Sequence, residues 1–319
     1  MSHDDTRPLL VTVPGATLRR ALERTKGGVP GGVELVEWDL AGPPPDAASG
    51  RRIDIVVPPY MGAAARLGAL DGVEVGLVQS QSIGYDDVPD ALPPGHVFAN
   101  AASVHETSTA ELALGLAIAA QRGIPDFVRA AAAGRWAPAR HDSLADRAVL
   151  LVGYGGVGRA IEERLAPFEV ELTRVASRAR DDEHGRVHGI DELPMLLPEA
   201  EIVFIGVPLN ASTTRLVDAA FLAALPDGAL VVNVARGPVA DTDAILAEAT
   251  SGRLRFALDV TDPEPLPDGH PLFALPNVLV SPHVGGATSA MMPRMARLLR
   301  DQIERMARGD EPRNVVLRT

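Results

Sequence analysis

The chain has 319 residues, with 42 acidic and 30 basic side chains and a formal charge of −12 at pH 7. Such an acidic balance argues against nucleic acids and anionic membranes as main partners. Cysteine is absent from the sequence, which excludes disulfides, thiol catalysis and thiolate metal sites and fits a reducing cytoplasm. The segment 1–10 is polar and acidic, unlike a signal peptide, and the longest apolar run, 112–120, is too short to cross a bilayer.

The first hundred residues alternate short strands with helical sequence. Residues 16–25 have the spacing of an amphipathic helix. Strands are predicted in the apolar runs at 8–13, 33–39, 53–59 and 73–84, the last of which enters a glycine turn. This alternation predicts a small α/β domain of the doubly wound kind.

A long helix is predicted at 106–121, followed by a proline-broken connection at 134–148. We expect Trp136 in that connection to anchor a core; the alternative is that it reaches a neighbouring subunit. A second alternating series begins with a strand and helix over 148–165. Further strand-like runs occupy 170–178, 200–208, 228–237, 254–260 and 277–283. They predict a sheet of roughly six strands. A final helix at 290–307 would cross back onto the first domain.

A glycine-rich turn, GYGGVG at 153–158, follows an apolar strand and opens a helix. Gly153 allows a tight turn, Gly155 lets the backbone approach a pyrophosphate, and Gly158 lets the helix pack against the strand. The N–H groups at a helix start favour phosphates. The turn therefore predicts a dinucleotide site that also includes Tyr154, Gly156 and Val157. The alternative is a purely structural turn.

The end of the next strand bears on the choice of nicotinamide cofactor. An acidic residue there would bind the ribose hydroxyls of NAD, but the strand that starts at 170 ends without one. Ser177 and Arg178 occupy that region and suit a 2′-phosphate. We therefore expect NADP(H) to be preferred, with NAD(H) as the alternative. Arg178 and Arg180 could also be simply solvated.

Three chemically active side chains follow three different strand-like runs. Arg236 lies in NVARG, Glu264 in DVTDPEPLP and His283 in SPHVGG. The carboxyl ends of parallel strands meet at one edge, so these residues are expected to converge. Arginine binds a carboxylate with two prongs, histidine passes a proton near neutral pH, and a carboxylate favours a charged imidazole. The alternative is a set of structural ion pairs.

No metal site is expected. His184 and His188 have the helical i, i+4 spacing that can bind a metal. They lie in a polar loop with glycines, and no third ligand is evident in the sequence.

The glycine turn, NVARGPVADTDAIL, DVTDPEPLP and SPHVGGAT occur in an order that resembles the D-isomer-specific 2-hydroxyacid dehydrogenases over nearly the whole chain. The resemblance implies an α/β fold of two Rossmann-like, doubly wound parallel-sheet domains with the active site in the cleft between them. The dinucleotide-binding domain, 100–289, would be inserted in a flavodoxin-like substrate domain formed by 1–99 and 290–319. Relatives of this kind are usually homodimers.

The resemblance also implies roles for individual residues. Arg236 would bind the carboxylate and keto oxygen of the substrate, His283 would be the general acid–base, and Glu264 would keep it protonated. Backbone N–H groups of Ile83 and Gly84 would hold the substrate carboxylate. Asp259 would contact the nicotinamide end. The remaining cofactor contacts would come from Val207, Pro208, Thr213, Val234, Arg236, His283 and Gly285.

The expected activity is hydride transfer between NAD(P)H and a small 2-keto or D-2-hydroxy acid, with glyoxylate and hydroxypyruvate as the expected substrates. Alternatives within the enzyme class are phosphoglycerate dehydrogenase, another 2-hydroxyacid dehydrogenase, or the formate and phosphite dehydrogenases that share the scaffold. A different class is a dinucleotide-sensing co-repressor. A cytoplasmic enzyme without nucleic-acid or membrane partners fits the composition.

Overall fold

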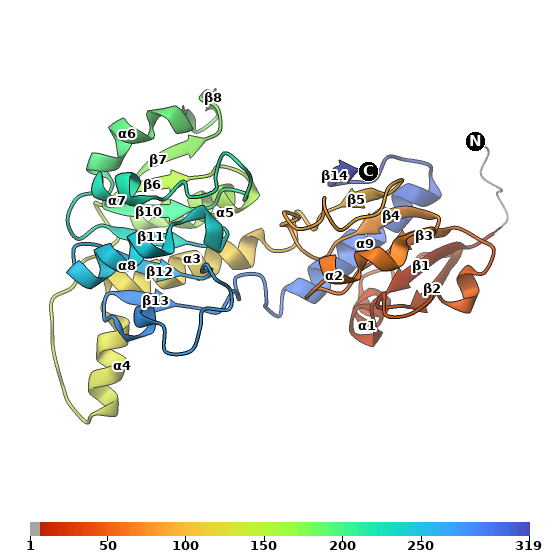
Figure 1. Ribbon diagram of the computed structural model, residues 1–319, viewed down its shortest axis with the longest axis horizontal. Coiled ribbons are helices and arrows are strands. Elements are labelled where there is room, and N and C mark those ends of the chain that lie inside the picture. The colour runs from red at the N-terminus through yellow and green to blue at the C-terminus, as the bar shows by residue number, and fades with distance from the viewer. Residues whose placement is uncertain (1–6) are drawn as a thin grey trace. The chain divides into compact units, whose positions relative to one another are not determined.

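The computed structural model describes residues 7–319, which divide into two compact units. Unit 1 is formed by residues 7–105 and 289–319, and unit 2 by residues 106–288, so unit 2 is inserted in the sequence of unit 1. Each unit is a mostly parallel sheet with helices on its faces (Figure 1). The predicted fold class of two doubly wound α/β domains is confirmed. The first six residues of the segment expected not to be a signal peptide lie outside the described residues.

The sheet of unit 1 has the strand order β2-β1-β3-β4-β5-β14. All neighbours are parallel except β14, which runs antiparallel to β5. This is the flavodoxin-like order with one added strand. The strands are β1 Leu9–Val13, β2 Val33–Glu37, β3 Ile53–Val56, β4 Val75–Gln79, β5 Val97–Ala99 and β14 Val315–Arg318. Each of the four strand runs predicted in this region contains one of them.

Two helices, α1 (Ala16–Arg24) and α9 (Met291–Ala307), pack together on one face of this sheet. Their apolar stripes, which include Leu18, Leu22 and Met295, are buried there. The short helix α2 (Ala64–Leu67) and the loops around it cover the other face. The final helix of the chain thus belongs to unit 1.

The sheet of unit 2 has the order β13-β12-β11-β10-β6-β7-β9-β8, and only β8 is antiparallel to its neighbour. Its first strand lies near the centre and the chain winds outward in both directions, as in dinucleotide-binding sheets. The strands are β6 Ala148–Val152, β7 Glu171–Ala176, β8 Arg180–Asp182, β9 Gly185–Gly189, β10 Ile202–Ile205, β11 Leu230–Asn233, β12 Arg255–Leu258 and β13 Val278–Val280. The prediction of about six strands was too low because the polar hairpin β8–β9 has no apolar run.

Helices cover both faces of the unit 2 sheet. One face carries α3 (Glu106–Gln121) and α5 (Gly156–Leu165). The other carries α6 (Leu193–Leu196), α7 (Ala219–Ala223) and α8 (Thr242–Ser251). The predicted helix at 106–121 is confirmed in full as α3.

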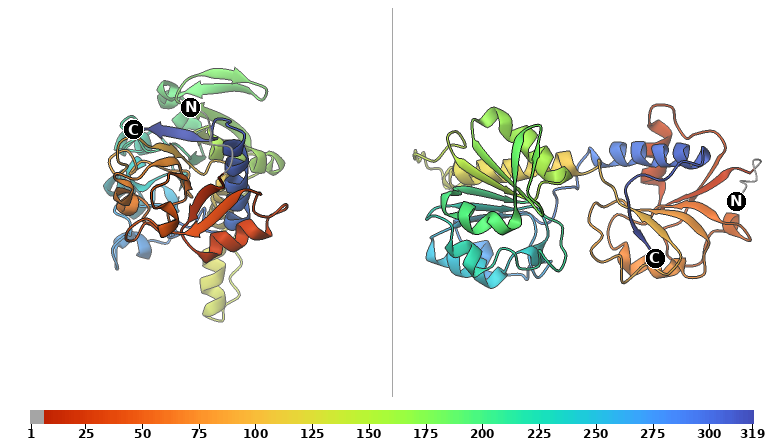
Figure 2. Two further views of the ribbon diagram at one scale, coloured as in Figure 1. Left: turned by 90° about the vertical axis from the view of Figure 1, so that its right-hand side faces the viewer. Right: turned by 90° about the horizontal axis from the view of Figure 1, so that it is seen from above.

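One helix, α4 (Ile124–Ala132), stands away from the sheet of its own unit (Figures 1 and 2). The irregular connection that follows it carries Trp136, whose side chain is 95% exposed. The expectation that Trp136 anchors a core is therefore wrong, because this connection runs outside the packed layers.

Candidate functional site

Six neighbouring strands of unit 2 have their carboxyl ends aligned at the same edge of the sheet. The last paired residues form one row across the sheet: Val175, Val152, Ile205, Asn233, Leu258 and Val280. The segments that follow these residues therefore leave the sheet at the same edge. Every site residue predicted in this unit lies on one of these segments.

The glycine turn after β6 fits a bound pyrophosphate. Gly153 has φ 106°, and a Cβ there would lie 2.5 Å from the Gly206 carbonyl carbon. A Cβ on Gly158 would lie 2.1 Å from the Gly153 oxygen, so the helix needs glycine to pack this closely. A Cβ on Gly155, in contrast, would meet no atom within 4 Å. Since α5 begins at Gly156 without a side-chain cap, its first N–H groups remain available to an anion.

Tyr154, in the same turn, points into the protein. Its side chain is 6% exposed, and its hydroxyl donates a hydrogen bond to Glu162. The guanidinium groups of Arg159, Arg174 and Arg180 lie 5.3–5.7 Å from its ring centre. Burial and the bond to Glu162 raise the pKa of the Tyr154 hydroxyl. The side chain therefore braces the turn, and only its backbone is placed to meet a cofactor.

The end of β7 presents cationic rather than acidic side chains. Ser177 and Arg178 directly follow the strand and are exposed. Within residues 7–319, Arg178 has no ion-pair or hydrogen-bond partner. The nearby Asp182 is occupied by Arg174, at 3.1 Å. This strand end therefore offers a hydroxyl and an unpaired guanidinium.

The loop after β10 is held by one threonine. Thr213 is 5% exposed; its hydroxyl donates to the Pro208 carbonyl at 2.6 Å and accepts from the Asn210 N–H at 2.9 Å. The hydroxyl thus shapes the loop that carries Val207 and Pro208. Val207 is buried and Pro208 is exposed.

Arg236 is positioned by a buried amide and a glycine. The Asn233 side chain, 1% exposed, accepts from the Ala235 N–H at 3.0 Å and donates to the Arg236 carbonyl at 3.4 Å. A Cβ on Gly237 would lie 1.8 Å from the Thr261 carbonyl oxygen, so only glycine lets these two segments touch. The partly buried Arg236 and the segment that leads to Glu264 are therefore neighbours at this edge.

The structure brings Glu264 and His283 into direct contact. The distance from His283 Nδ1 to Glu264 Oε1 is 2.5 Å, and the two side chains are 43% and 41% exposed. Because this bond uses Nδ1, the ring nitrogen left to face a substrate is Nε2. His283 has φ 51°, a left-handed conformation that histidine adopts more readily than most residues.

Asp259 holds the loop that carries His283. Its carboxylate is 3% exposed and accepts hydrogen bonds from the Ser281 hydroxyl at 2.6 Å and from the N–H groups of Val284 and Gly285, both at 2.9 Å. The His283 N–H donates to the Asp259 carbonyl at 2.8 Å. Sequence reasoning missed this role, although an acidic residue directly after a buried strand was a usable signal.

Ile83 and Gly84 lie in unit 1, in the loop after β4. The Asn100 side chain donates to the Ile83 carbonyl at 2.9 Å. Within residues 7–319, the N–H groups of Ile83 and Gly84 donate no hydrogen bond. The loop therefore presents two free backbone donors, as a carboxylate site requires.

Two residues that the sequence did not single out support this loop. His105, 5% exposed, contacts the Gln81 carbonyl through Nε2 at 2.6 Å and stacks on Tyr60 with 5.6 Å between ring centres. Gln81 in turn donates to the Pro58 carbonyl at 2.9 Å.

His188 is engaged by a carboxylate: its Nδ1 lies 2.8 Å from Glu192 Oε2, and its neighbour His184 lies between β8 and β9. In the described part of the chain, no three His, Asp or Glu side chains are grouped to hold a metal ion. No helix among residues 7–319 has the length and apolar character needed to span a membrane.

Known proteins match this chain over both units. A family model described as D-isomer specific 2-hydroxyacid dehydrogenase, NAD binding domain, matches residues 114–285. A glyoxylate reductase of Thermofilum pendens is 31% identical over 74% of this chain and 73% of its own length. The human glyoxylate reductase/hydroxypyruvate reductase is 27% identical over 75% of this chain and 76% of its own. A D-isomer specific 2-hydroxyacid dehydrogenase from Xanthobacter autotrophicus Py2, crystallised with NADPH and MES, is 28% identical, with a TM-score of 0.80 over 98% of each chain.

Proposed function

Because the chain belongs to the D-isomer specific 2-hydroxyacid dehydrogenase family, we propose that it reduces glyoxylate or hydroxypyruvate to the corresponding D-2-hydroxy acid. It is an NAD(P)-dependent oxidoreductase that acts on small 2-keto acids. The names of the Thermofilum and human relatives support the choice of substrate. The contact between His283 and Glu264 is the observation that carries the catalytic assignment.

Three side chains of unit 2 perform the chemistry in this proposal. A dinucleotide held at the glycine turn after β6 would supply the hydride for C2 of the keto acid. Arg236 binds the substrate and stabilises the negative charge that develops on the keto oxygen. His283 donates its Nε2 proton to that oxygen, and Glu264 stabilises the charged imidazole through Nδ1.

The substrate carboxylate is assigned to the loop of unit 1. The N–H groups of Ile83 and Gly84, which have no partner among residues 7–319, support this assignment, since adjacent backbone donors suit a carboxylate. In the proposed division of labour, residues 1–99 and 290–319 form the substrate domain, and residues 100–289 form the dinucleotide domain.

NADP(H) is the proposed preferred cofactor, with NAD(H) as the alternative. Support comes from the exposed Ser177 and Arg178 directly after β7; among residues 7–319 Arg178 is unpaired, and the nearby Asp182 is held by Arg174. We expect Arg178→Ala to raise KM for NADPH by about tenfold or more and to leave KM for NADH nearly unchanged. Arg140→Ala, at an exposed arginine of unit 2 that has no partner among residues 7–319, is the matched control, and equal effects on both cofactors would contradict the assignment.

A homodimer is proposed on the strength of α4 and the connection after it. Four apolar side chains are exposed there, namely Ile124 at 42%, Phe127 at 41%, Val128 at 63% and Trp136 at 95%. A second copy of the chain would cover this apolar surface. Sedimentation velocity should show a dimer that Val128→Asp weakens. A cytoplasmic location without nucleic-acid or membrane partners completes the proposal.

The substrate is tested by initial rates with NADPH and NADH against glyoxylate, hydroxypyruvate, pyruvate, phenylpyruvate and 3-phosphohydroxypyruvate. Fast NADPH oxidation with glyoxylate or hydroxypyruvate is the expected result. Faster turnover of 3-phosphohydroxypyruvate would replace the proposed substrate with a phosphorylated one. No turnover of any compound in the panel, with tight NADPH binding retained, would favour a dinucleotide-sensing protein instead.

A further inference from the structure

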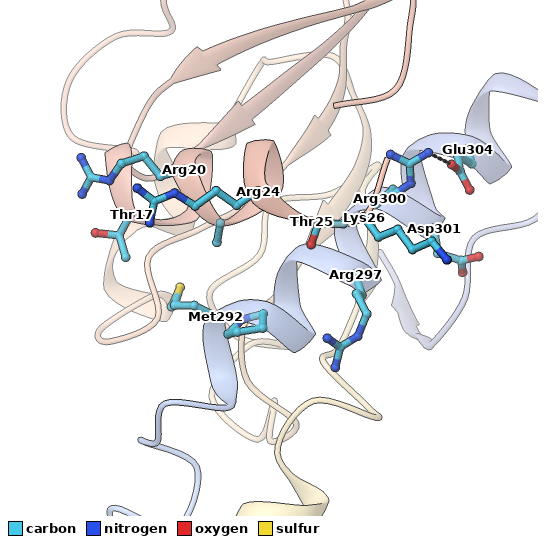
Figure 3. Close-up of a pocket in the computed structure, with 12 residues that line it drawn as sticks. Thr17, Arg20, Arg24, Thr25, Lys26, Met292, Arg297, Arg300, Asp301 and Glu304 are labelled. Atoms are coloured by element: carbon cyan, nitrogen blue, oxygen red, sulfur yellow. Dashed lines mark ion pairs between the residues drawn. The ribbon is translucent and has the colours of Figure 1, made fainter. Parts of the chain in front are cut away.

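We propose that unit 1 carries a second binding site, for a small organic phosphate, in a pocket between α1 and α9. This inference does not depend on the proposed activity, since the pocket contains none of the residues assigned to substrate or cofactor. The cavity has a volume of about 720 Å³, within the range of small-molecule sites. Figure 3 shows Arg20 and Arg24 extending from α1, and Met292 and Arg297 extending from α9.

The pocket is lined by more cations than anions. Its charged side chains are Arg20, Arg24, Lys26, Arg297, Arg300, Asp301 and Glu304. Both acidic groups are already paired. Glu304 lies 2.6 Å from Arg300, and Asp301 lies 2.7 Å from Arg313, which is outside the pocket lining. The acids therefore leave most of the positive charge uncompensated.

Arg20, Arg24, Lys26 and Arg297 are the uncompensated cations. Within residues 7–319 these side chains form no ion pair, hydrogen bond or ring contact. Arg24 and Lys26 have a structural reason for their place, because positive charge is favourable near the C-terminus of α1. Arg20 has no such reason, and its repulsion of Arg24 one turn away destabilises the helix. A bound anion would remove that repulsion.

The character of the lining defines the ligand. Guanidinium groups bind phosphate oxygens with two parallel hydrogen bonds, and four unpaired cations match a ligand with several negative charges. The rest of the wall includes Ala21, Met292 and Pro293, which offer apolar contact but no charge. This combination fits a phosphate or diphosphate ester with an apolar body.

Calorimetric titration with geranyl diphosphate tests this site, with inorganic pyrophosphate as the probe that lacks an apolar body. Saturating NADPH and a saturating 2-keto acid analogue such as oxamate keep the probes from the glycine turn and Arg236. We expect geranyl diphosphate to bind at one site, tighter than pyrophosphate. Arg24→Gln and Arg297→Gln should each weaken binding by about tenfold or more. Arg52→Gln, an exposed and unpaired arginine of the same unit outside the pocket, is the matched control.

Each outcome decides the proposal. The proposal is supported if Arg24→Gln and Arg297→Gln weaken the binding of geranyl diphosphate and Arg52→Gln does not. The reductase activity of all three variants should stay unchanged. No binding of geranyl diphosphate, pyrophosphate or phosphatidic acid vesicles, or an equal loss in Arg52→Gln, overturns it. Equal affinity for pyrophosphate overturns the assignment of an apolar body. Sedimentation with phosphatidic acid vesicles, without binding of soluble geranyl diphosphate, would replace the free ligand with a lipid headgroup.

Discussion

In both units the loops at the carboxyl ends of the strands are held by hydrogen bonds, but the side chains that make these bonds differ in charge. In unit 2, charged groups organise the edge: Asp259 holds the His283 loop and Glu264 contacts the imidazole. In unit 1, neutral amides do this work. Asn100 supports the loop with Ile83, and Gln302 donates to Gln79 at 2.7 Å. Asp259 in unit 2 and Asn100, Gln79 and Gln302 in unit 1 are all buried, so the two networks differ in charge and not in burial.

This difference matches the chemistry proposed for each edge. Proton transfer needs titratable groups and fixed charges beside the reacting atoms. A loop that receives a carboxylate needs free N–H donors, and the Asn100 amide supports the Ile83 carbonyl without adding a charge of its own. Changes to the two networks should therefore have different kinetic signatures, with kcat affected in unit 2 and KM in unit 1.

The largest effect is expected from Asp259→Asn. The new NH₂ group would face one of the N–H donors of Val284 and Gly285, so the loop that positions His283 would shift. We expect a loss of about 2–4 kcal/mol in kcat/KM, mostly in kcat. Steady-state kinetics and NADPH titration check this. Retained kcat with weakened NADPH binding would instead assign the carboxylate to the nicotinamide end.

Glu264→Gln tests the second charge of unit 2. The amide can still contact His283 Nδ1 but no longer favours the protonated ring. The pH profile of ketone reduction should move toward acid, with a rate loss of about tenfold at pH 8. An unchanged profile would remove Glu264 from the proton-transfer step. The pH profile of NADPH binding serves as the control and should stay the same.

Asn100→Ala tests the neutral edge of unit 1. Loss of the bond to the Ile83 carbonyl should loosen the loop, and KM for the keto acid should rise by about fivefold to twentyfold with kcat little changed. Gln302→Ala is the control, because it removes a buried amide from the neighbouring network without touching Ile83. A fall in kcat at constant KM would contradict the proposed carboxylate loop.

The sequence could predict the strands and the motifs that follow them. Apolar runs bounded by glycine or polar residues mark β6, β10, β11, β12 and β13, and a parallel sheet brings their ends to one edge. Arg236, Glu264 and His283 are predicted as site residues in this way, and in the structure Glu264 and His283 are in contact.

Other features depend on contacts that no local pattern reports. The hairpin β8–β9 is polar and gains its place by pairing with β7. Trp136 has a large apolar side chain of the kind found in protein cores, but it lies on an exposed connection. The hydrogen bonds of Asp259 join segments more than 20 residues apart, and the inward position of Tyr154 depends on Glu162 and Arg174. Such arrangements follow from tertiary packing and not from spacing along the chain.

The smallest expected effect is on stability, and it comes from a comparison of one ion pair in each unit. In unit 2, Glu201 lies 2.5 Å from Arg147 and also accepts the Ala148 N–H at 3.0 Å; in unit 1, Glu34 lies 2.7 Å from Arg51. Partial burial opposes ionisation of Glu201, but the bonds from Ala148 and Arg147 prevail and lower the pKa of its carboxyl below the ordinary 4.5. The resulting stability is present above that value and is lost as pH falls through the lowered pKa.

Glu201→Gln should therefore destabilise the protein at pH 7 by less than about 1 kcal/mol, since both side chains are more than one-third exposed. The deficit should shrink as the pH is lowered from 5 to 3, because the wild-type carboxyl then becomes protonated as well. Glu34→Gln is the matched control and should cost less, because among residues 7–319 the Glu34 carboxylate is bonded only to Arg51 and to no backbone N–H. Urea unfolding at several pH values measures both. A deficit for Glu201→Gln that does not change with pH would show that the charge of Glu201 contributes nothing.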